Sequence, residues 1–321
     1  MPPRPRPGKR IFKALLPVVL LPLLAAVVFA LWVVYSASHP PRHAYLMTPE
    51  GFGLISERGL QVKEEKWRNR DGTEARGWLL RGGEGAPAVV MLHRYGADRS
   101  WALNLGVMLN EASNVTVLWP DLRGHGENPP VSSTTFGARE RDDLLDAFEF
   151  LRGLQSPQGR PQVGDRLGLY GVELGAYAAL LAARAAPQVK ALVLDSTPAS
   201  ADELLSGVVS ERVGIDNGLI RLLARGGARL YFLGRYENTS SCIAAETLGE
   251  PRVLLLSGND ATHLRTSSEI LSKCFPNPSN VELRVGLPLT GFTQASSPAQ
   301  QGETYARLVI DFFGRSLQPA P

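Results

Sequence analysis

The segment Leu169–Leu180, with the sequence LYGVELGAYAAL, restricts the fold of this chain more than any other short stretch. An apolar run ends at one glycine, and a run of small, helix-forming residues starts at a second glycine four positions later. Glycine tolerates the backbone conformations that a sharp turn needs. The pattern predicts a buried strand, a tight turn and a buried helix, with the side chain of Glu173 presented at the edge of a sheet.

Short apolar runs alternate with helical segments through most of the chain. The predicted strands are LQVKEEKW, EARGWLLR, PAVVMLH, VTVLW, RLGLYG, KALVLD, RVLLLSG and VELRV, and helices are expected near 99–112, 139–154, 173–186, 262–275 and 299–315. The first two strands flank Asp71-Gly72, a strong β-hairpin signal. This alternation predicts an α/β fold, in which a mostly parallel central sheet is covered by helices on both faces.

The segment 196–250 is too long for a simple crossover between two strands. Its amphipathic stretches ADELLSGVVSERV and GLIRLLARGGARLYFL predict a small helical cap, although one crossover helix with a surface excursion also fits the sequence. Either arrangement lies at the carboxyl edge of the sheet, where open α/β sheets bind ligands. The expected domain therefore spans 51–316 with this cap-like insertion, and 317–321 form a C-terminal tail.

Ala14–Tyr35 carries no charged residue, and the segment 1–13 before it is basic. At 1.5 Å per residue this run is about 33 Å long, enough to cross a hydrocarbon core of about 30 Å. The basic segment predicts a cytoplasmic N-terminus, a single-pass transmembrane helix, a linker over 36–50 and a domain in the bacterial periplasm or at the cell exterior. The alternative is a cleaved signal peptide, for which the sequence SAS at 36–38 is a poor cleavage site.

The charge of the chain does not indicate a nucleic-acid partner. Its 34 basic residues outnumber 31 acidic ones, but five of the basic residues precede the apolar run and the remainder is slightly acidic. We therefore expect a membrane partner through the N-terminal helix, and a small molecule or protein that the sequence does not identify. We expect no cofactor and no metal, because histidines and carboxylates do not cluster at metal-binding spacings.

The two cysteines, Cys242 and Cys274, both lie in the body of the chain. Because the two cysteines are close in sequence, we expect a disulfide between them in an oxidising compartment. Closing a loop of about 33 residues would stabilise the fold by about 3–4 kcal/mol on the chain-entropy estimate. The alternative is two buried free thiols.

Six motifs stand out along the chain, namely DGTEARGWLL, VVMLHRYGADRS, LWPDLRGHGEN, TTFGARERDDLLDAFEFL, GVELGAY and VLLLSGNDATHL. Their order resembles that of the α/β-hydrolase superfamily. Over about 52–316 the chain resembles bacterial hydrolases of the serine-aminopeptidase and prolyl-oligopeptidase-like type. The resemblance implies the α/β-hydrolase fold.

The resemblance also implies a catalytic triad in the chain order nucleophile, acid, histidine. The nucleophile position falls on Glu173 instead of serine, and the acid position falls on Asp260, which is intact. The histidine position falls on Leu289 or Thr290 within GLPLTGF, and no histidine follows His263. Two of the three triad members are therefore missing.

The loop after the third strand departs from the family pattern as well. The family has a His-Gly pair where this chain has His93-Arg94, followed by Tyr95. Because the nucleophile position has become an anion and its neighbour a cation, we hypothesise that Arg94 and Glu173 pair across the former active site. Alternatively, both side chains point into water. The expected binding residues are Arg94, Tyr95, Glu173 and Leu174.

The sequence thus favours a membrane-anchored α/β-hydrolase-fold protein that has no serine-hydrolase activity and binds a ligand or a partner protein. The alternative is an active hydrolase of esters or short peptides that uses non-standard residues. A covalent intermediate on Glu173 would need a histidine-activated water for its release. His263 would approach from the wrong loop to supply that histidine, and an acid/base pair of Glu173 with Asp260 would fail if an arginine lowered the pKa of Glu173.

Overall fold

The computed structural model describes residues 7–51, 61–127, 129–293 and 299–318, so parts of the basic N-terminal segment and of the C-terminal tail lie outside the described residues. Its centre is an eight-stranded sheet with the order β1-β2-β4-β3-β5-β6-β7-β8. The strands are β1 (Lys63–Arg68), β2 (Glu74–Leu80), β3 (Ala86–Leu92), β4 (Thr116–Pro120), β5 (Val163–Val172), β6 (Val189–Asp195), β7 (Arg252–Gly258) and β8 (Val281–Leu287). β2 pairs antiparallel with β1 and β4, and the remaining pairs are parallel. The predicted mostly parallel sheet is confirmed.

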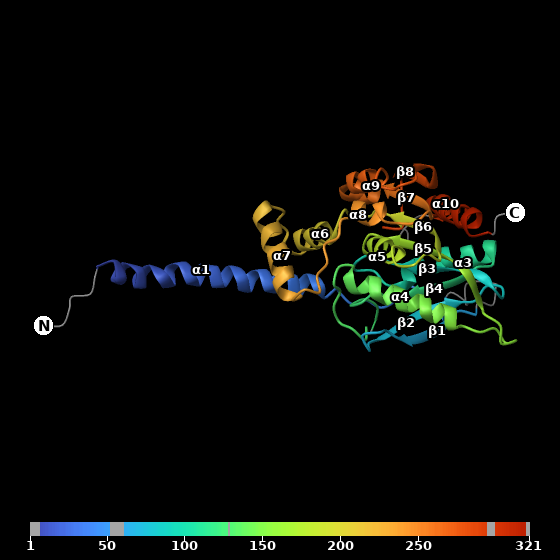
Figure 1. Ribbon diagram of the computed structural model, residues 1–321, viewed down its shortest axis with the longest axis horizontal. Helices are drawn as coiled ribbons and strands as arrows, with labels where there is room; N and C mark the ends of the chain where they lie inside the picture. The colour runs from blue at the N-terminus through green and yellow to red at the C-terminus, as the bar shows by residue number, and fades with distance from the viewer. Residues whose placement is uncertain (1–6, 52–60, 128, 294–298, 319–321) are drawn as a thin grey trace.

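Helices cover both faces of this sheet (Figure 1). The α-helices are α1 (Pro7–Ser38), α3 (Leu103–Ser113), α4 (Ala138–Gly153), α5 (Leu174–Ala183), α6 (Ala201–Val213), α7 (Gly218–Tyr231), α8 (Ser241–Glu246), α9 (Arg265–Leu271) and α10 (Ala299–Leu317). Short 3-10 turns cover Arg99–Ala102, Asn259–Leu264 and Pro278–Asn280. Buried side chains of α4 and α5 form one hydrophobic core with the sheet, and those of α3 and α10 form a second core on the opposite face.

β5 occupies the middle of the sheet, between β3 and β6. Its last six residues are all buried, as expected for a strand that is covered on both faces. Because β3, β5, β6 and β7 run parallel, their carboxyl ends meet at one edge of the sheet. Any side chain presented directly after these strands therefore faces the same small volume.

The N-terminal helix differs from the sequence expectation at its carboxyl end. The sequence predicts a linker from residue 36, whereas α1 continues through Ser38 and buries Val34 and Ala37 completely. The backbone N–H of Thr134 donates to the Ser38 carbonyl at 2.9 Å, which ties the end of the helix to the domain. Leu16–Ser38, with a mean hydropathy of 2.7, is long and apolar enough to cross a membrane. The helix is thus continuous from this apolar span into the folded domain (Figure 1).

Three helices, α6, α7 and α8, lie between β6 and β7, within the segment 196–250. The Asn217 side chain caps α7, accepting the backbone N–H of Ile220 at 2.9 Å, and the Ser200 side chain caps α6 in the same way. α7 packs against both α1 and α6. The insertion therefore gathers around the end of the N-terminal helix, although the limits of the domains remain predictions.

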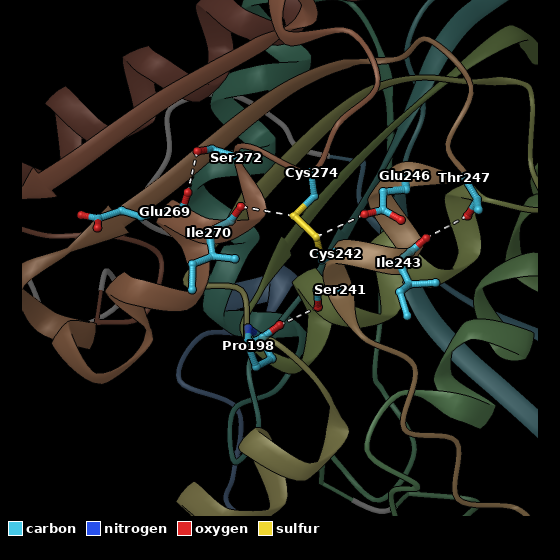
Figure 2. Close-up of a disulfide and its surroundings, with 10 residues drawn as sticks. All are labelled: Pro198, Ser241, Cys242, Ile243, Glu246, Thr247, Glu269, Ile270, Ser272 and Cys274. Carbon is cyan, nitrogen blue, oxygen red and sulfur yellow. Dashed lines mark hydrogen bonds between the residues drawn. A yellow bond between two sulfur atoms is a disulfide. The ribbon is translucent and has the colours of Figure 1, made fainter.

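Cys242 in α8 and Cys274 after α9 are joined by a disulfide, with their Cα atoms 5.2 Å apart (Figure 2). The bond links the insertion to the segment that follows β7. Beside it, the Ser241 hydroxyl donates to the Pro198 carbonyl at 2.6 Å. The disulfide thus fastens the last helix of the insertion to the body of the domain, and the hydrogen bond ties that helix to the start of the insertion.

Candidate functional site

A tight turn between β5 and α5 presents Glu173 at the carboxyl edge of the sheet. Glu173 has φ 49° and ψ −105°, a backbone conformation that residues with a Cβ rarely adopt. The two flanking glycines permit the turn, because a Cβ on Gly175 would lie 2.6 Å from the Leu92 carbonyl oxygen and one on Gly171 would overlap the backbone of Gly175. The geometry is that of a nucleophile elbow, with a glutamate at the nucleophile position.

The carboxylate of Glu173 is bound by backbone N–H groups. Its Oε2 accepts the N–H of Tyr95 at 2.9 Å, and the side chain is only 8% exposed. Burial raises the pKa of Glu173 to about 7, while the N–H groups of Tyr95 and Leu174 and the charge of Arg94 act in the opposite direction. In hydrolases with this elbow, an N–H of the loop after β3 and the N–H after the nucleophile form the oxyanion hole. Glu173 therefore occupies the place where a substrate oxyanion would be stabilised.

Arg94 does not form the predicted ion pair with Glu173 in the described part of the chain. Its guanidinium donates to the carbonyls of Phe292 at 2.9 Å and Tyr95 at 3.0 Å. It also lies 4.9 Å from the ring centroids of both Trp101 and Phe292. Aromatic rings and carbonyls already satisfy the cation, so it acts on Glu173 only through its longer-range charge.

The residues at the acid and histidine positions of the implied triad do meet. Asp260, directly after β7, accepts the backbone N–H of Thr290 at 3.0 Å and the Thr290 hydroxyl at 3.0 Å. The Thr293 hydroxyl donates to the same carboxylate at 2.8 Å. Of the two predicted candidates, Thr290 rather than Leu289 therefore touches the acid. A threonine hydroxyl does not take up a proton near neutral pH, so Asp260 orients a group that cannot serve as the base.

Asp195 at the end of β6 was not predicted from the sequence as a site residue, yet its side chain lies behind this site. Its Oδ2 accepts the N–H of Gly291 at 2.7 Å and the Tyr305 hydroxyl at 2.6 Å, and Tyr305 also contacts the Tyr170 hydroxyl at 3.0 Å. Burial raises the pKa of Asp195 to about 7. The sequence shows an aspartate at the end of KALVLD, but it does not predict which residues of distant elements contact that aspartate. Asp195 fixes the loop that carries Thr290.

Two histidines beside the site are buried and hold loops in place. His93 Nδ1 contacts the Arg94 carbonyl at 2.8 Å, and its Nε2 accepts the N–H of Leu122 at 3.1 Å. Burial lowers the pKa of His93 to about 4 and that of His125 to about 3, so both are neutral at physiological pH. His263 is exposed and sets its ring edge-on against Phe292. None of the three donates to or accepts from Glu173.

The end of α1 and the cap helix α6 close over this site. The Tyr95 hydroxyl donates to the Ala37 carbonyl of α1 at 2.7 Å. Arg212 of α6 donates to the same hydroxyl at 3.3 Å and to the His39 carbonyl at 3.2 Å. Tyr95 therefore connects the N-terminal helix, through its hydroxyl, to Glu173, through its N–H.

This closure limits which of the four expected binding residues a ligand can reach. Leu174 is 0% exposed, and Tyr95 and Glu173 are buried as well. Arg94 is partly exposed, as are Trp101 and Phe292, which flank it. Across the described ranges, no group of three His, Cys, Asp or Glu side chains is placed to hold a metal ion. The accessible part of the site is thus a cationic and aromatic rim.

No protein-family model matches this chain. A thiohydrolase of Arthrinium phaeospermum is 31% identical over 136 residues, which make up 42% of this chain and 42% of that protein. The match thus spans less than half of the relative, so it does not assign the thiohydrolase activity to this chain.

Solved structures cover more of the chain at lower identity. An esterase of Pyrococcus furiosus has a TM-score of 0.64 at 19% identity, over 88% of this chain and 98% of that one. An α/β hydrolase of Penicillium has a TM-score of 0.60 at 16% identity, over 80% and 99% of the two chains. An acylaminoacyl peptidase of Pyrococcus horikoshii has a TM-score of 0.56 at 16% identity, over 86% of this chain and 45% of the peptidase. These matches show the α/β-hydrolase fold, and the fold predicted from six sequence motifs is confirmed.

Proposed function

We propose that this protein with the α/β-hydrolase fold is a membrane-anchored binding protein that does not hydrolyse substrates. The observation that carries the proposal is the hydrogen bond from the Tyr95 N–H to Glu173 Oε2. In a hydrolase of this fold, that N–H would stabilise the negative charge that develops on the substrate. Here a carboxylate of the chain itself takes the hydrogen bond. Thr290, next to Asp260, supplies no base that could activate a nucleophile.

A partner would contact the rim of the closed site. Arg94 lies 4.9 Å from the ring centroids of both Trp101 and Phe292, and the His263 ring contacts Phe292 edge-on. This combination of a cation with aromatic side chains is typical of interaction surfaces, where such residues anchor a partner. We therefore place the binding of a small molecule or protein at this rim.

The anchoring part of the proposal rests on the apolar span Leu16–Ser38. The basic segment 1–13 before it supports a cytoplasmic N-terminus, and the disulfide between Cys242 and Cys274 supports an oxidising compartment for the domain. Protease is added to bacterial cells whose outer membrane has been permeabilised and whose inner membrane is intact. It should degrade the domain, while a cytoplasmic control protein survives. Survival of the domain under these conditions would reverse the proposed orientation.

The activity part is tested on the full chain in detergent micelles. Chromogenic esters, aminopeptidase substrates and a fluorophosphonate probe should give no turnover or labelling above a heat-inactivated sample. A matched Glu173→Ala variant shows whether any residual activity depends on the elbow. Turnover well above background that disappears in Glu173→Ala would overturn the proposal.

One observation favours the alternative, an active hydrolase. Burial brings the pKa of Glu173 to about 7, which suits a general acid or base at neutral pH. Such an activity would follow a pH profile centred near that pKa, and it would be insensitive to the fluorophosphonate probe because no nucleophilic serine is involved. The same assays therefore separate it from contamination by a conventional serine hydrolase.

A further inference from the structure

The cap helix α7 leaves a row of large apolar side chains uncovered. Leu219, Leu222 and Leu230 are 64%, 66% and 50% exposed. Their spacing of three and eight residues places them on one stripe of the helix. Leu233, just after the helix, is 81% exposed and adds to the uncovered apolar surface.

Next to the apolar stripe runs a basic one. Arg221, Arg225 and Arg229 recur every fourth residue, all three are exposed, and α7 contains no acidic residue. Arg221 pairs with Asp216 and Arg225 with Asp202, whereas Arg229 makes no ion pair with any residue that the structure describes. An exposed apolar stripe flanked by arginines is the pattern of a helix that lies at a membrane surface.

α7 is held directly across α1 (Figure 1). The two helices touch at Gly227, where an added Cβ would lie 2.8 Å from the Ala30 carbonyl oxygen and 3.1 Å from Val34 Cγ2. The rings of Tyr35 and Tyr231 meet edge-on with centroids 6.4 Å apart. The position of α7 along the N-terminal helix is therefore fixed.

That position coincides with the boundary of a bilayer crossed by α1. The charge-free run starts at Ala14, and about 20 helical residues cross a hydrocarbon core of about 30 Å, which ends near Val33. The crossing with α7 at Ala30–Val34 lies within the last turn of this span, at the depth of about 5–10 Å typical of interfacial helices. Trp32 and Tyr35 are exposed at the same level, as in the aromatic belts of membrane proteins.

A groove opens at the same level, between α1 and α6. It has a volume of about 420 Å³ and is lined by Trp32, Val33, Ser36, Arg212 and Val213. Arg212 donates only to neutral oxygens within the described residues. A second cation is thereby available at the height where lipid headgroups would lie.

We propose that α7 lies in the membrane interface beside α1, with Leu219, Leu222 and Leu230 in contact with lipid and its arginines facing anionic headgroups. This inference rests on the proposed anchoring by α1, because α1 sets the depth of α7. It adds a second, peripheral membrane contact, which seats the cap on the bilayer and turns the closed site toward the membrane surface.

The test uses the full chain reconstituted into vesicles of phosphatidylcholine and phosphatidylglycerol. Cys242 and Cys274 are bonded to each other, so one introduced cysteine is the only free thiol that an environment-sensitive NBD label can modify. Leu222→Cys reports on α7, Val28→Cys reports on the exposed face of α1, and Val285→Cys reports on an exposed position of β8, a strand that lies away from α1 (Figure 1). Quenching by lipids that carry a spin label in the acyl chain is then compared among the three positions.

The inference expects labels at 222 and 28 to be quenched several-fold more strongly than the label at 285. Quenching at 28 but not at 222 would overturn the inference and leave the anchoring by α1 intact. Absence of quenching at both positions would overturn the anchoring as well. Leu219→Cys repeats the measurement at a second exposed position, so failure of one variant to fold does not decide the outcome.

A second copy of this chain is the rival occupant of the apolar stripe. In that case unlabelled Leu222→Cys would form a disulfide-linked dimer at low protein-to-lipid ratio when a mild oxidant is added. In a separate labelled sample, the label at 222 would be shielded from water without being quenched by the lipid. That result would also overturn the inference. As a check on the charges, Arg229→Gln should reduce the quenching at 222 in phosphatidylglycerol vesicles more than in vesicles of phosphatidylcholine alone.

Discussion

At the residue scale, Glu173 combines two unfavourable features in one position. Its positive φ costs a residue with a Cβ about 1–3 kcal/mol, and its carboxyl group is almost completely buried. Two backbone N–H groups compensate part of the burial. The elbow thus combines a strained backbone with a side chain that makes a local hydrogen bond.

The raised pKa of Glu173 makes stability depend on pH in a defined direction. With a pKa near 7 in the folded chain and 4.5 in the unfolded chain, the folded state binds more protons between these values. The contribution of Glu173 to stability is therefore present below about pH 4.5 and is lost as pH rises to about 7, with an upper limit of about 3 kcal/mol. Relative to the wild type, Glu173→Gln should melt increasingly higher as pH rises from 5 to 8. An equal difference in Tm at both pH values would contradict this assignment.

Rebuilding the triad tests whether its geometry has survived. Thr290 contacts Asp260, so a histidine at 290 would be oriented by an existing carboxylate. The double variant Glu173→Ser, Thr290→His should hydrolyse a chromogenic acetate about a hundredfold faster than Glu173→Ser alone, because a general base contributes about 10²–10⁴-fold. Adding Asp260→Asn should remove most of the gain. Equal rates for the single and double variants would mean that the loop holding Thr290 is wrongly placed for catalysis.

The sequence predicted which residues of the site lie together, but it did not predict their contacts. The order of the motifs placed Glu173, Asp260 and Thr290 at one edge of the sheet. It did not reveal that Arg94 turns to Trp101 and Phe292, because the direction of a loop side chain depends on packing from distant segments. The hydrogen bond from the Tyr95 N–H to Glu173 could not be predicted for the same reason.

At the scale of the elements, the crossing of α1 and α7 depends on a single glycine. α7 contains two adjacent glycines that differ in surroundings: a Cβ on Gly226 would meet open space, whereas one on Gly227 would press on the backbone of Ala30. Small residues allow helices to approach closely in this way. The apolar period of α7 was visible in the sequence, but its partner was not, because amphipathicity shows that a face is apolar and not what covers it.

These two glycines provide a matched pair of substitutions. In an α-helix, Gly→Ala stabilises by about 1 kcal/mol through helix propensity, and both positions share this gain. Gly226→Ala should therefore raise Tm in detergent micelles. Gly227→Ala should lower it, because the added methyl group forces the helices apart at a cost of about 1–3 kcal/mol. If both variants were stabilised alike, α7 would not pack on α1 as closely as the structure has it.

At the scale of the whole molecule, the N-terminal helix and the domain form one structure. The sequence predicts a membrane helix, a linker and a domain as separate parts. In the structure the last turns of α1 enter the hydrophobic core, and its Ala37 carbonyl accepts the Tyr95 hydroxyl next to the elbow. A charge-free run cannot reveal this, because its apolar residues suit contact with lipid and with protein equally well.

This arrangement argues against cleavage near Ser38, which would remove core residues from the mature chain. Burying Val33 and Val34 contributes about 3–6 kcal/mol together, so a chain that begins at His39 should melt at least about 5 °C below the full chain in the same micelles. A chain that begins at Phe29 is the control: it lacks most of the apolar span but keeps the docked turns, so its Tm should match that of the full chain. If instead the chain from His39 were as stable as the chain from Phe29, the docking of α1 would contribute nothing to the fold, and a cleaved signal peptide would become the better interpretation of the apolar run.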